Sequence, residues 1–148
     1  MKVSMAERTD KFTVITIKSQ AEQVNEVCQQ ILDELQKKDY SPDDIFGVHL
    51  ALEEALVNAV KHGNNSDPAK KVVIEYSVTD QKLEVNITDE GTGFKPCSIP
   101  DPRCCDNVYK FGGRGLLLMR EFMDFVEYNK EGNTVHMVRL RNSEKYSN

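Results

Sequence analysis

Apolar residues recur along this chain at intervals that change from segment to segment, and the intervals predict its elements. Alternation of apolar and polar residues predicts a first strand from Phe12 to Ile17. Spacings of three and four then predict a helix from Ala21 to Lys37. Its apolar face would be formed by Val24, Val27, Cys28, Ile31, Leu32 and Leu35.

A second helix is predicted to begin at Pro42, because "SPDD" supplies an N-cap at Ser41, a proline at the first helical position and early acids. The pattern continues to about His62, where Gly63 fits a C-terminal cap.

The residue pattern in the second half of the chain predicts two hairpins, separated by a loop and a helix. A loop rich in Pro, Cys and Asp runs from Lys95 to Phe111, and "GGRG" then opens a helix that continues to about Met123. The predicted strands are Lys71 to Val78, Lys82 to Thr88, Phe125 to Asn129 and Thr134 to Leu140. Strands and helices in this order predict an α+β fold, a two-layer sandwich with a mixed, mostly antiparallel sheet and helices on one face.

Length and charge narrow the class of protein. A chain of 148 residues is most simply a single domain. The net charge of -5 argues against a general binder of nucleic acid or anionic membranes, although backbone amides and a metal ion could still neutralise a polyphosphate. No apolar run approaches the ~20 residues of a membrane span, and the first residues lack a signal-peptide core. We therefore expect a cytoplasmic protein.

The four cysteines do not form a zinc-binding pattern. Cys28 falls in the first predicted helix, and Cys97, Cys104 and Cys105 fall in the loop, without paired C-x-x-C spacing. We expect free thiols in a reducing compartment.

The second predicted helix carries a narrow polar stripe between two apolar arcs. Glu54 and Asn58 are four residues apart and share this stripe with Gly47 and Lys61, whereas Glu53 lies about 100° round the axis. The stripe could be a solvated surface, which spacing alone favours. It could instead face a cleft, where the carboxylate would polarise an attacking group and the amide oxygen would hold a hard cation such as Mg²⁺.

An acid follows the third predicted strand on its inward side. Asp89 shares the parity of Leu83, Val85 and Ile87, and a buried carboxylate needs a hydrogen-bond donor, such as the exocyclic amino group of adenine. Asp89 could also cap its own turn, "DEGTG", and the two interpretations are compatible. A ligand could approach the backbone closely at the glycines of this turn, Gly91 and Gly93.

Glycines also precede the last predicted helix, in "FGGRGLLLM". Free amides at a helix N-terminus favour phosphate, although "GGRG" could equally be a flexible hinge. Arg114 could contact phosphate or be an exposed charge.

Taken together and in this order, the three segments resemble the Bergerat-fold (GHKL) ATPase superfamily, which includes gyrase, Hsp90, histidine kinases and MutL. The chain is most similar to the small bacterial anti-sigma-factor serine/threonine kinases, over roughly Phe12 to Leu140. The matching motifs are E-x-x-x-N at Glu54–Asn58, D-x-G-x-G at Asp89–Gly93, and G-x-G-L at Gly113–Leu116.

The resemblance implies a role for each matching residue. Glu54 would be the catalytic base, Asn58 would coordinate Mg²⁺, and Asp89 would accept from the adenine amino group. The G-x-G-L motif would contact the phosphates through Gly113 and Gly115, and Lys95 to Phe111 would form a lid over ATP. The other residues implied in nucleotide binding are Gly91 and Gly93 around the base, Arg114 and Leu116 in the G-x-G-L motif, and Thr134, which would support Asp89.

The implied function is a Mg-ATP-dependent kinase that acts as an anti-sigma factor. It would bind a sigma factor, phosphorylate an anti-anti-sigma antagonist of the STAS type, and form a homodimer through the first strand and first helix. One alternative is a nucleotide-binding regulatory module that sequesters a partner without significant phosphate transfer. Another is a switch kinase within a larger signalling complex.

Overall fold

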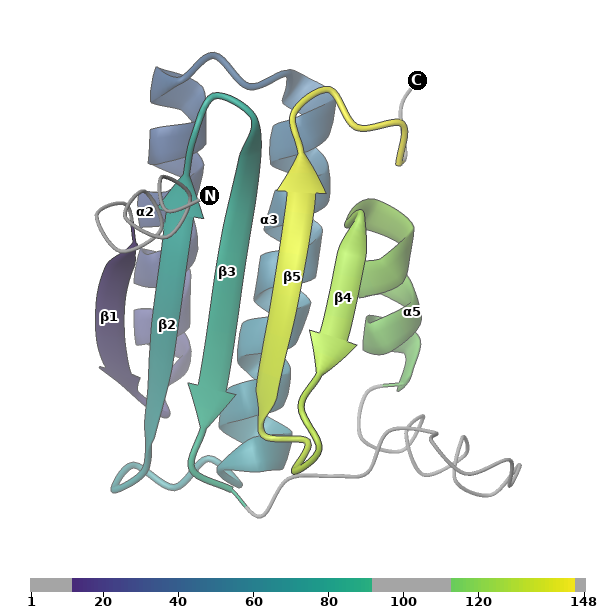
Figure 1. Cartoon of the computed structure of the whole chain (residues 1–148). Helices are drawn as coiled ribbons and strands as arrows, with labels where there is room; N and C mark the ends of the chain where they lie inside the picture. Colours follow the sequence, from purple (N-terminus) through teal and green to yellow (C-terminus); the bar gives the residue numbers. More distant parts are fainter. Residues whose placement is uncertain (1–11, 92–112, 146–148) are drawn as a thin grey trace, which may run out of the picture.

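The computed structural model describes residues 12–91 and 113–145, and of residues 113–116 the backbone alone. Five strands form one sheet in the order β1-β2-β3-β5-β4, and each neighbouring pair is antiparallel. The helices cover one face of this sheet (Figure 1). The elements are β1 (Thr13–Lys18), α2 (Ala21–Lys37), α3 (Pro42–Val57), η1 (Asn58–Gly63), β2 (Lys71–Val78), β3 (Lys82–Asp89), α5 (Gly113–Phe122), β4 (Phe125–Tyr128) and β5 (Thr134–Leu140). The predicted α+β two-layer sandwich is confirmed, with an antiparallel sheet rather than a mixed one.

Most element boundaries agree with the sequence pattern to within one residue. The N-cap at Ser41 is confirmed, because its side chain accepts a hydrogen bond from the Asp44 backbone N–H at 3.1 Å. One boundary is wrong: α3 does not end at a capping Gly63. It continues directly into the π-helical turn η1, whose C-cap is Asn64.

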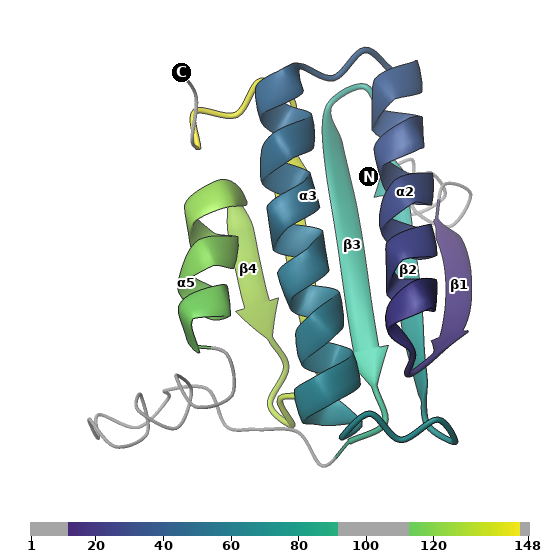
Figure 2. The same cartoon turned by 180° about the vertical axis from the view of Figure 1, so that it is seen from behind.

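The core lies between the sheet and the helices. The inward positions of β3 and the six predicted apolar positions of α2 are all buried. Helix α3 lies between α2 and α5 (Figure 2), which explains why it carries apolar residues on two sides. No helix in the described part of the chain is both long and apolar enough to cross a bilayer.

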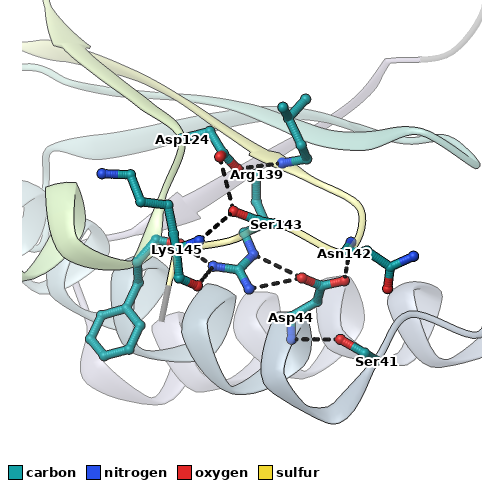
Figure 3. Close-up of polar contacts among 9 residues, drawn as sticks. Ser41, Asp44, Asp124, Arg139, Asn142, Ser143 and Lys145 are labelled. Carbon is teal, nitrogen blue, oxygen red and sulfur yellow. Dashed lines mark hydrogen bonds and ion pairs between the residues drawn. The ribbon is translucent and has the colours of Figure 1, made fainter. Parts of the chain in front are cut away.

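A buried ion pair connects the sheet to the first turn of α3. The guanidinium of Arg139 on β5 donates to Asp44 Oδ1 from Nε at 3.0 Å and from Nη2 at 2.8 Å, and both side chains are inaccessible to solvent (Figure 3). Arg139 Nη1 donates to the carbonyls of Phe122 (2.6 Å) and Lys145 (2.9 Å), and Asp44 Oδ2 accepts from Asn142 N–H at 2.8 Å. The pair therefore holds α3, the end of α5 and the C-terminal segment against one end of the sheet.

Gly47 permits this arrangement. A Cβ atom there would lie 3.2 Å from Arg139 Nη1 and 3.3 Å from the Phe122 ring, so a larger residue would press on both. The predicted polar stripe is thus buried at its N-terminal end.

We predict that Asp44→Ala lowers the free energy of unfolding by about 3–5 kcal/mol, because it leaves the buried guanidinium of Arg139 without its counter-charge. Urea unfolding followed by circular dichroism measures the change. Asp80→Ala is the control, since it removes an exposed ion pair to Lys38 at 3.9 Å and should cost far less. Equal losses in the two variants would contradict a dominant role for the buried pair.

Candidate functional site

At the opposite end of α3, the turn η1 brings the backbone against the end of β3. The N–H of Asn64 donates to the carbonyl of Ala59 at 2.9 Å, a bond across five residues that widens the turn. A Cβ atom on Gly63 would lie 2.3 Å from the Asp89 carboxylate carbon, and one on Gly91 would lie 1.8 Å from the Gly63 carbonyl oxygen. Gly63 is therefore required by close approach to Asp89 rather than as a helix cap.

Asp89 occupies the last inward position of β3, as predicted. Its side chain is largely buried, with 9% of the residue exposed, and Oδ1 accepts from the Gly91 N–H at 2.8 Å. The predicted capping of its own turn is thus observed. Both carboxylate oxygens lie close to Gly63, because a Cβ atom there would be 2.3 Å from Oδ2 and 2.6 Å from Oδ1. Burial raises the pKa of the Asp89 carboxyl above its ordinary 3.8, and the Gly91 hydrogen bond and the charge of Lys70 lower it in part.

Asn64 fixes the chain around Asp89. Its side chain is fully buried, and Nδ2 donates to Ser19 Oγ at 3.0 Å and to the Lys71 carbonyl at 2.9 Å. Its Oδ1 accepts from the Glu90 N–H at 2.8 Å. One amide therefore joins the turn after η1 to the start of α2, the start of β2 and the end of β3. We did not identify Asn64 from the sequence, where its local pattern resembles that of a surface turn.

A small cavity lies at this junction, with a volume of about 40 Å³. Asn58 and Asp89 both line it, although they are 31 residues apart in the chain. A cavity of this volume has room for water but is too small for a purine base. The other lining residues are Ala55, Ala59, His62, Gly63, Ile87, Tyr128, Asn133 and Val135.

Glu54 lies one turn before Asn58 and is half-buried, close enough for its charge to raise the pKa of the Tyr128 hydroxyl. Glu53 points elsewhere: it is exposed and pairs with His49, with Oε2 3.6 Å from Nε2. The expectation that the two adjacent acids face different surroundings is confirmed.

The structure describes only part of the two glycine motifs, D-x-G-x-G and G-x-G-L. Gly91 lies at the end of β3 beside Asp89, whereas Gly93 and the expected lid lie outside the described residues. Helix α5 begins at Gly113, as predicted, and starts at the end of the sheet where β3 finishes (Figure 1). The side chains of Arg114 and Leu116 lie outside the described part.

The expected support of Asp89 by Thr134 requires correction. Thr134 pairs with Thr88 across the strands, and their hydroxyl oxygens are 2.9 Å apart. Since side chains alternate along a strand, both hydroxyls lie on the sheet face opposite to Asp89. The neighbouring Asn133 instead lines the cavity, and its carbonyl accepts from the Asp89 N–H at 2.9 Å.

The expectation of free thiols is tested only at Cys28. It is a buried free thiol, and burial, with the charge of Glu53, raises its pKa to about 12, so it is not a reactive nucleophile. Cys97, Cys104 and Cys105 lie outside the described residues.

The arrangement has the chemistry of a nucleotide site. A buried carboxylate can accept from an amino group, an amide oxygen can ligate a hard cation, and a half-buried carboxylate lies one turn away. The described residues contain no group of three or more His, Cys, Asp or Glu side chains that could hold a metal ion. A cation at Asn58 would therefore take most of its ligands from phosphates and water, as Mg²⁺ commonly does.

Comparisons with known proteins point to one family. Residues 17–139 match the family described as the histidine kinase-like ATPase domain. The chain is 33% identical to the serine-protein kinase RsbW of Bacillus licheniformis over 116 residues, which covers 74% of the chain and 72% of that protein. It is 34% identical to RsbW of Bacillus subtilis (strain 168) over 113 residues, covering 72% and 71%.

A solved structure agrees in fold. The crystal structure of the RsbU and RsbW domains of a Mycobacterium tuberculosis protein matches with a TM-score of 0.60 and 16% identity. The match covers 93% of this chain and 34% of that one.

We predict that Asp89→Asn raises the free energy of unfolding at neutral pH. The folded pKa of Asp89 lies above its unfolded value, so the folded state binds more protons and its stability falls as pH rises through this interval. The advantage of the variant should be full above the folded pKa and disappear as pH falls below 3.8.

Urea unfolding between about pH 3 and pH 8 checks this, since the range extends below the unfolded pKa. Asp80→Asn, at an exposed carboxylate, is the control. A gain that stays constant across the pH range would contradict the burial penalty.

Proposed function

The chain belongs to the histidine kinase-like ATPase domain family, and from that membership we propose that it is a Mg-ATP-dependent serine/threonine protein kinase acting as an anti-sigma factor. One structural observation carries the proposal. Asn58 from the helical layer and Asp89 from the sheet converge on one cavity, with Glu54 one helical turn away. Relatives that are named serine-protein kinases support the same reaction.

In this proposal Asp89 selects the base of the nucleotide. The buried carboxylate would accept from the adenine amino group, which supplies a donor that burial otherwise denies it. The small size of the cavity means that its walls move apart when a base enters. Gly91 and Gly93 would let the chain lie close to the base, and the main-chain carbonyl of Asn133 would hold Asp89 in place.

The phosphates would lie between Asn58 and the start of α5. Amides at Gly113 and Gly115 offer donors at a helix N-terminus, and Arg114 and Leu116 belong to the same turn. Asn58 would contribute an oxygen ligand to Mg²⁺, which when bound neutralises phosphate charge. The segment Lys95 to Phe111 would act as the lid.

Glu54 would orient the attacking hydroxyl and accept its proton. Its position one turn from Asn58 would put the base next to the cation ligand. This supports the proposal because phosphoryl transfer depends mainly on positioning and charge neutralisation. The protein substrate would be an anti-anti-sigma antagonist of the STAS type, and the second partner a sigma factor.

We predict that Glu54→Gln lowers the rate of phosphate transfer by about 10²–10⁴-fold, the usual contribution of a general base, while ATP binding changes little. Labelled ATP and the cognate antagonist give the transfer rate, and calorimetry gives the ATP affinity. Glu53→Gln is the matched control, since the adjacent acid is exposed and should leave transfer intact.

The result also separates the competing functions. A wild-type chain that binds ATP and its partners but transfers no phosphate would be a regulatory nucleotide-binding module. A chain that transfers phosphate but captures no sigma factor would be a switch kinase in another signalling complex.

A homodimer is part of the proposal. Strand β1 forms one edge of the sheet made by the described strands, and Val14 on it is 60% exposed. Pairing through β1 and α2 would cover this residue.

We predict that Val14→Lys shifts the chain from dimer to monomer, because it places a charge in the covered interface. Sedimentation velocity over a concentration series measures the change. Leu117→Lys on α5 is the control, at another exposed apolar position. A wild-type chain that stays monomeric at every concentration would contradict the dimer.

A further inference from the structure

The turn that begins at Asp89 has an acceptor for each of its first three backbone amides. The N–H of Asp89 donates to the Asn133 carbonyl at 2.9 Å, and the N–H of Gly91 donates to Asp89 Oδ1 at 2.8 Å. Between them, the N–H of Glu90 donates to Asn64 Oδ1 at 2.8 Å. With these three amides occupied, the group that this turn presents to a base is the Asp89 carboxylate, which is an acceptor.

The side-chain amide of Asn64 can face Glu90 in only one orientation. Its Nδ2 group donates to the Lys71 carbonyl at 2.9 Å and to Ser19 Oγ at 3.0 Å, while Oδ1 accepts from Glu90. Half a turn of the amide would bring an N–H group against the Glu90 N–H and an oxygen against the Lys71 carbonyl, which are two unfavourable contacts. Because the Asn64 side chain is fully buried, solvent does not relieve them. Oδ1 is therefore fixed as the acceptor for Glu90.

The bond from Glu90 to Asn64 fixes the backbone on one side of Asp89. A peptide unit is planar, so holding the Glu90 N–H holds the whole unit that follows Asp89. The unit before Asp89 is held in the same way by the carbonyl of Asn133. Gly63, the residue before Asn64, lies against the carboxylate itself, since a Cβ atom there would be 2.3 Å from Oδ2. The turn after η1 therefore restrains both the backbone and the side chain of Asp89.

The exocyclic group of a purine decides whether it can meet a carboxylate. Adenine has an amino group, which donates, whereas hypoxanthine has an oxygen in its place, which would repel a carboxylate. A site could still accept that oxygen if a backbone N–H were available to it. The N–H of Glu90, next to Asp89 in the chain, would become such a donor if Asn64 did not occupy it. Discrimination between two ligands often depends on excluding the wrong one in this way.

We propose that Asn64 is a positioning residue that determines the base selectivity of the nucleotide site. By accepting from Glu90 it holds the Asp89 carboxylate in place, and it removes the backbone donor that a purine with an exocyclic oxygen would need. The inference rests on the proposed function, because it concerns the base of the same nucleotide. Asn64 lies outside the E-x-x-x-N, D-x-G-x-G and G-x-G-L motifs.

A purely structural role for Asn64 would have a different consequence. Losing a buried amide that joins three segments would lower the free energy of unfolding and weaken the binding of every nucleotide alike. The ratio of two nucleotide affinities would then stay unchanged. The ratio of the affinities for ATP and ITP, whose base is hypoxanthine, therefore separates the two roles.

We predict that Asn64→Ala reduces the preference for ATP over ITP on the order of tenfold, the scale of one hydrogen bond. Calorimetric titration of each nucleotide in the presence of Mg²⁺ gives the two dissociation constants. Ser19→Ala is the matched control, because it removes a partner of Nδ2 on the same Asn64 amide and leaves the contact with Glu90 in place. Its ratio of affinities should equal that of the wild type.

A second variant tests the same contact by keeping it. Asn64→Asp retains an oxygen for the Glu90 N–H and loses the donor to Lys71, so it should keep the wild-type ratio while its added charge weakens both nucleotides.

Amide hydrogen exchange gives a measurement that does not depend on any variant being folded. In the nucleotide-free wild-type chain the Glu90 N–H should exchange slowly, because it is bonded to a fully buried side chain. It should exchange faster in Asn64→Ala and stay slow in Ser19→Ala.

An unchanged ratio in Asn64→Ala, or an equal loss in Asn64→Asp or Ser19→Ala, would overturn the inference and leave the proposed function standing. Rapid exchange of the Glu90 N–H in the wild-type chain would overturn it in the same way, as would equal affinities of the wild type for ATP and ITP. A wild-type chain that binds no nucleotide would overturn the proposed function and the inference together.

Discussion

The buried ion pair between Asp44 and Arg139 is the contact on which the placement of α3 depends. Removing two charges from water is costly. Here the cost is offset by two hydrogen bonds from Arg139 to Asp44 and by hydrogen bonds between each side chain and backbone groups. Its geometry admits one position of the first turn of α3 relative to β5. The packing of α3 between α2 and α5, and of η1 against β3, then sets where the other end of the helix, with Asn58, meets the sheet.

The functional end of α3 is built on close backbone approach rather than on charge pairing. Gly63 and Gly91 let the turn after α3 lie directly against Asp89, and Asn64 ties that turn to three other segments. The consequence is a carboxylate that is buried with few donors. A site of this kind is less stable than an apolar one at neutral pH, and a ligand that supplies a donor recovers part of the loss. In the proposed function, the stability of the fold and the binding of the nucleotide are therefore linked through Asp89.

Among the residues that the structure describes, the site contains little that could bind a metal without a nucleotide. In the proposed function, Asn58 would supply a single neutral ligand, the oxygen of its side-chain amide. The relatives named as kinases are 33% and 34% identical to this chain, and the physical requirements of phosphoryl transfer explain why so few protein groups are needed.

Periodicity in the sequence was enough to predict most of the elements and the inward direction of Asp89, because these depend on local spacing and on which face of a strand or helix is apolar. It also separated Glu54 from Glu53. Only the tertiary structure decided that Gly63 abuts Asp89, that Asn64 joins three segments, and that Thr134 faces away while Asn133 and Tyr128 face the cavity. Those facts depend on which distant segments come into contact, and a local pattern carries no information about contacts between residues far apart in the chain.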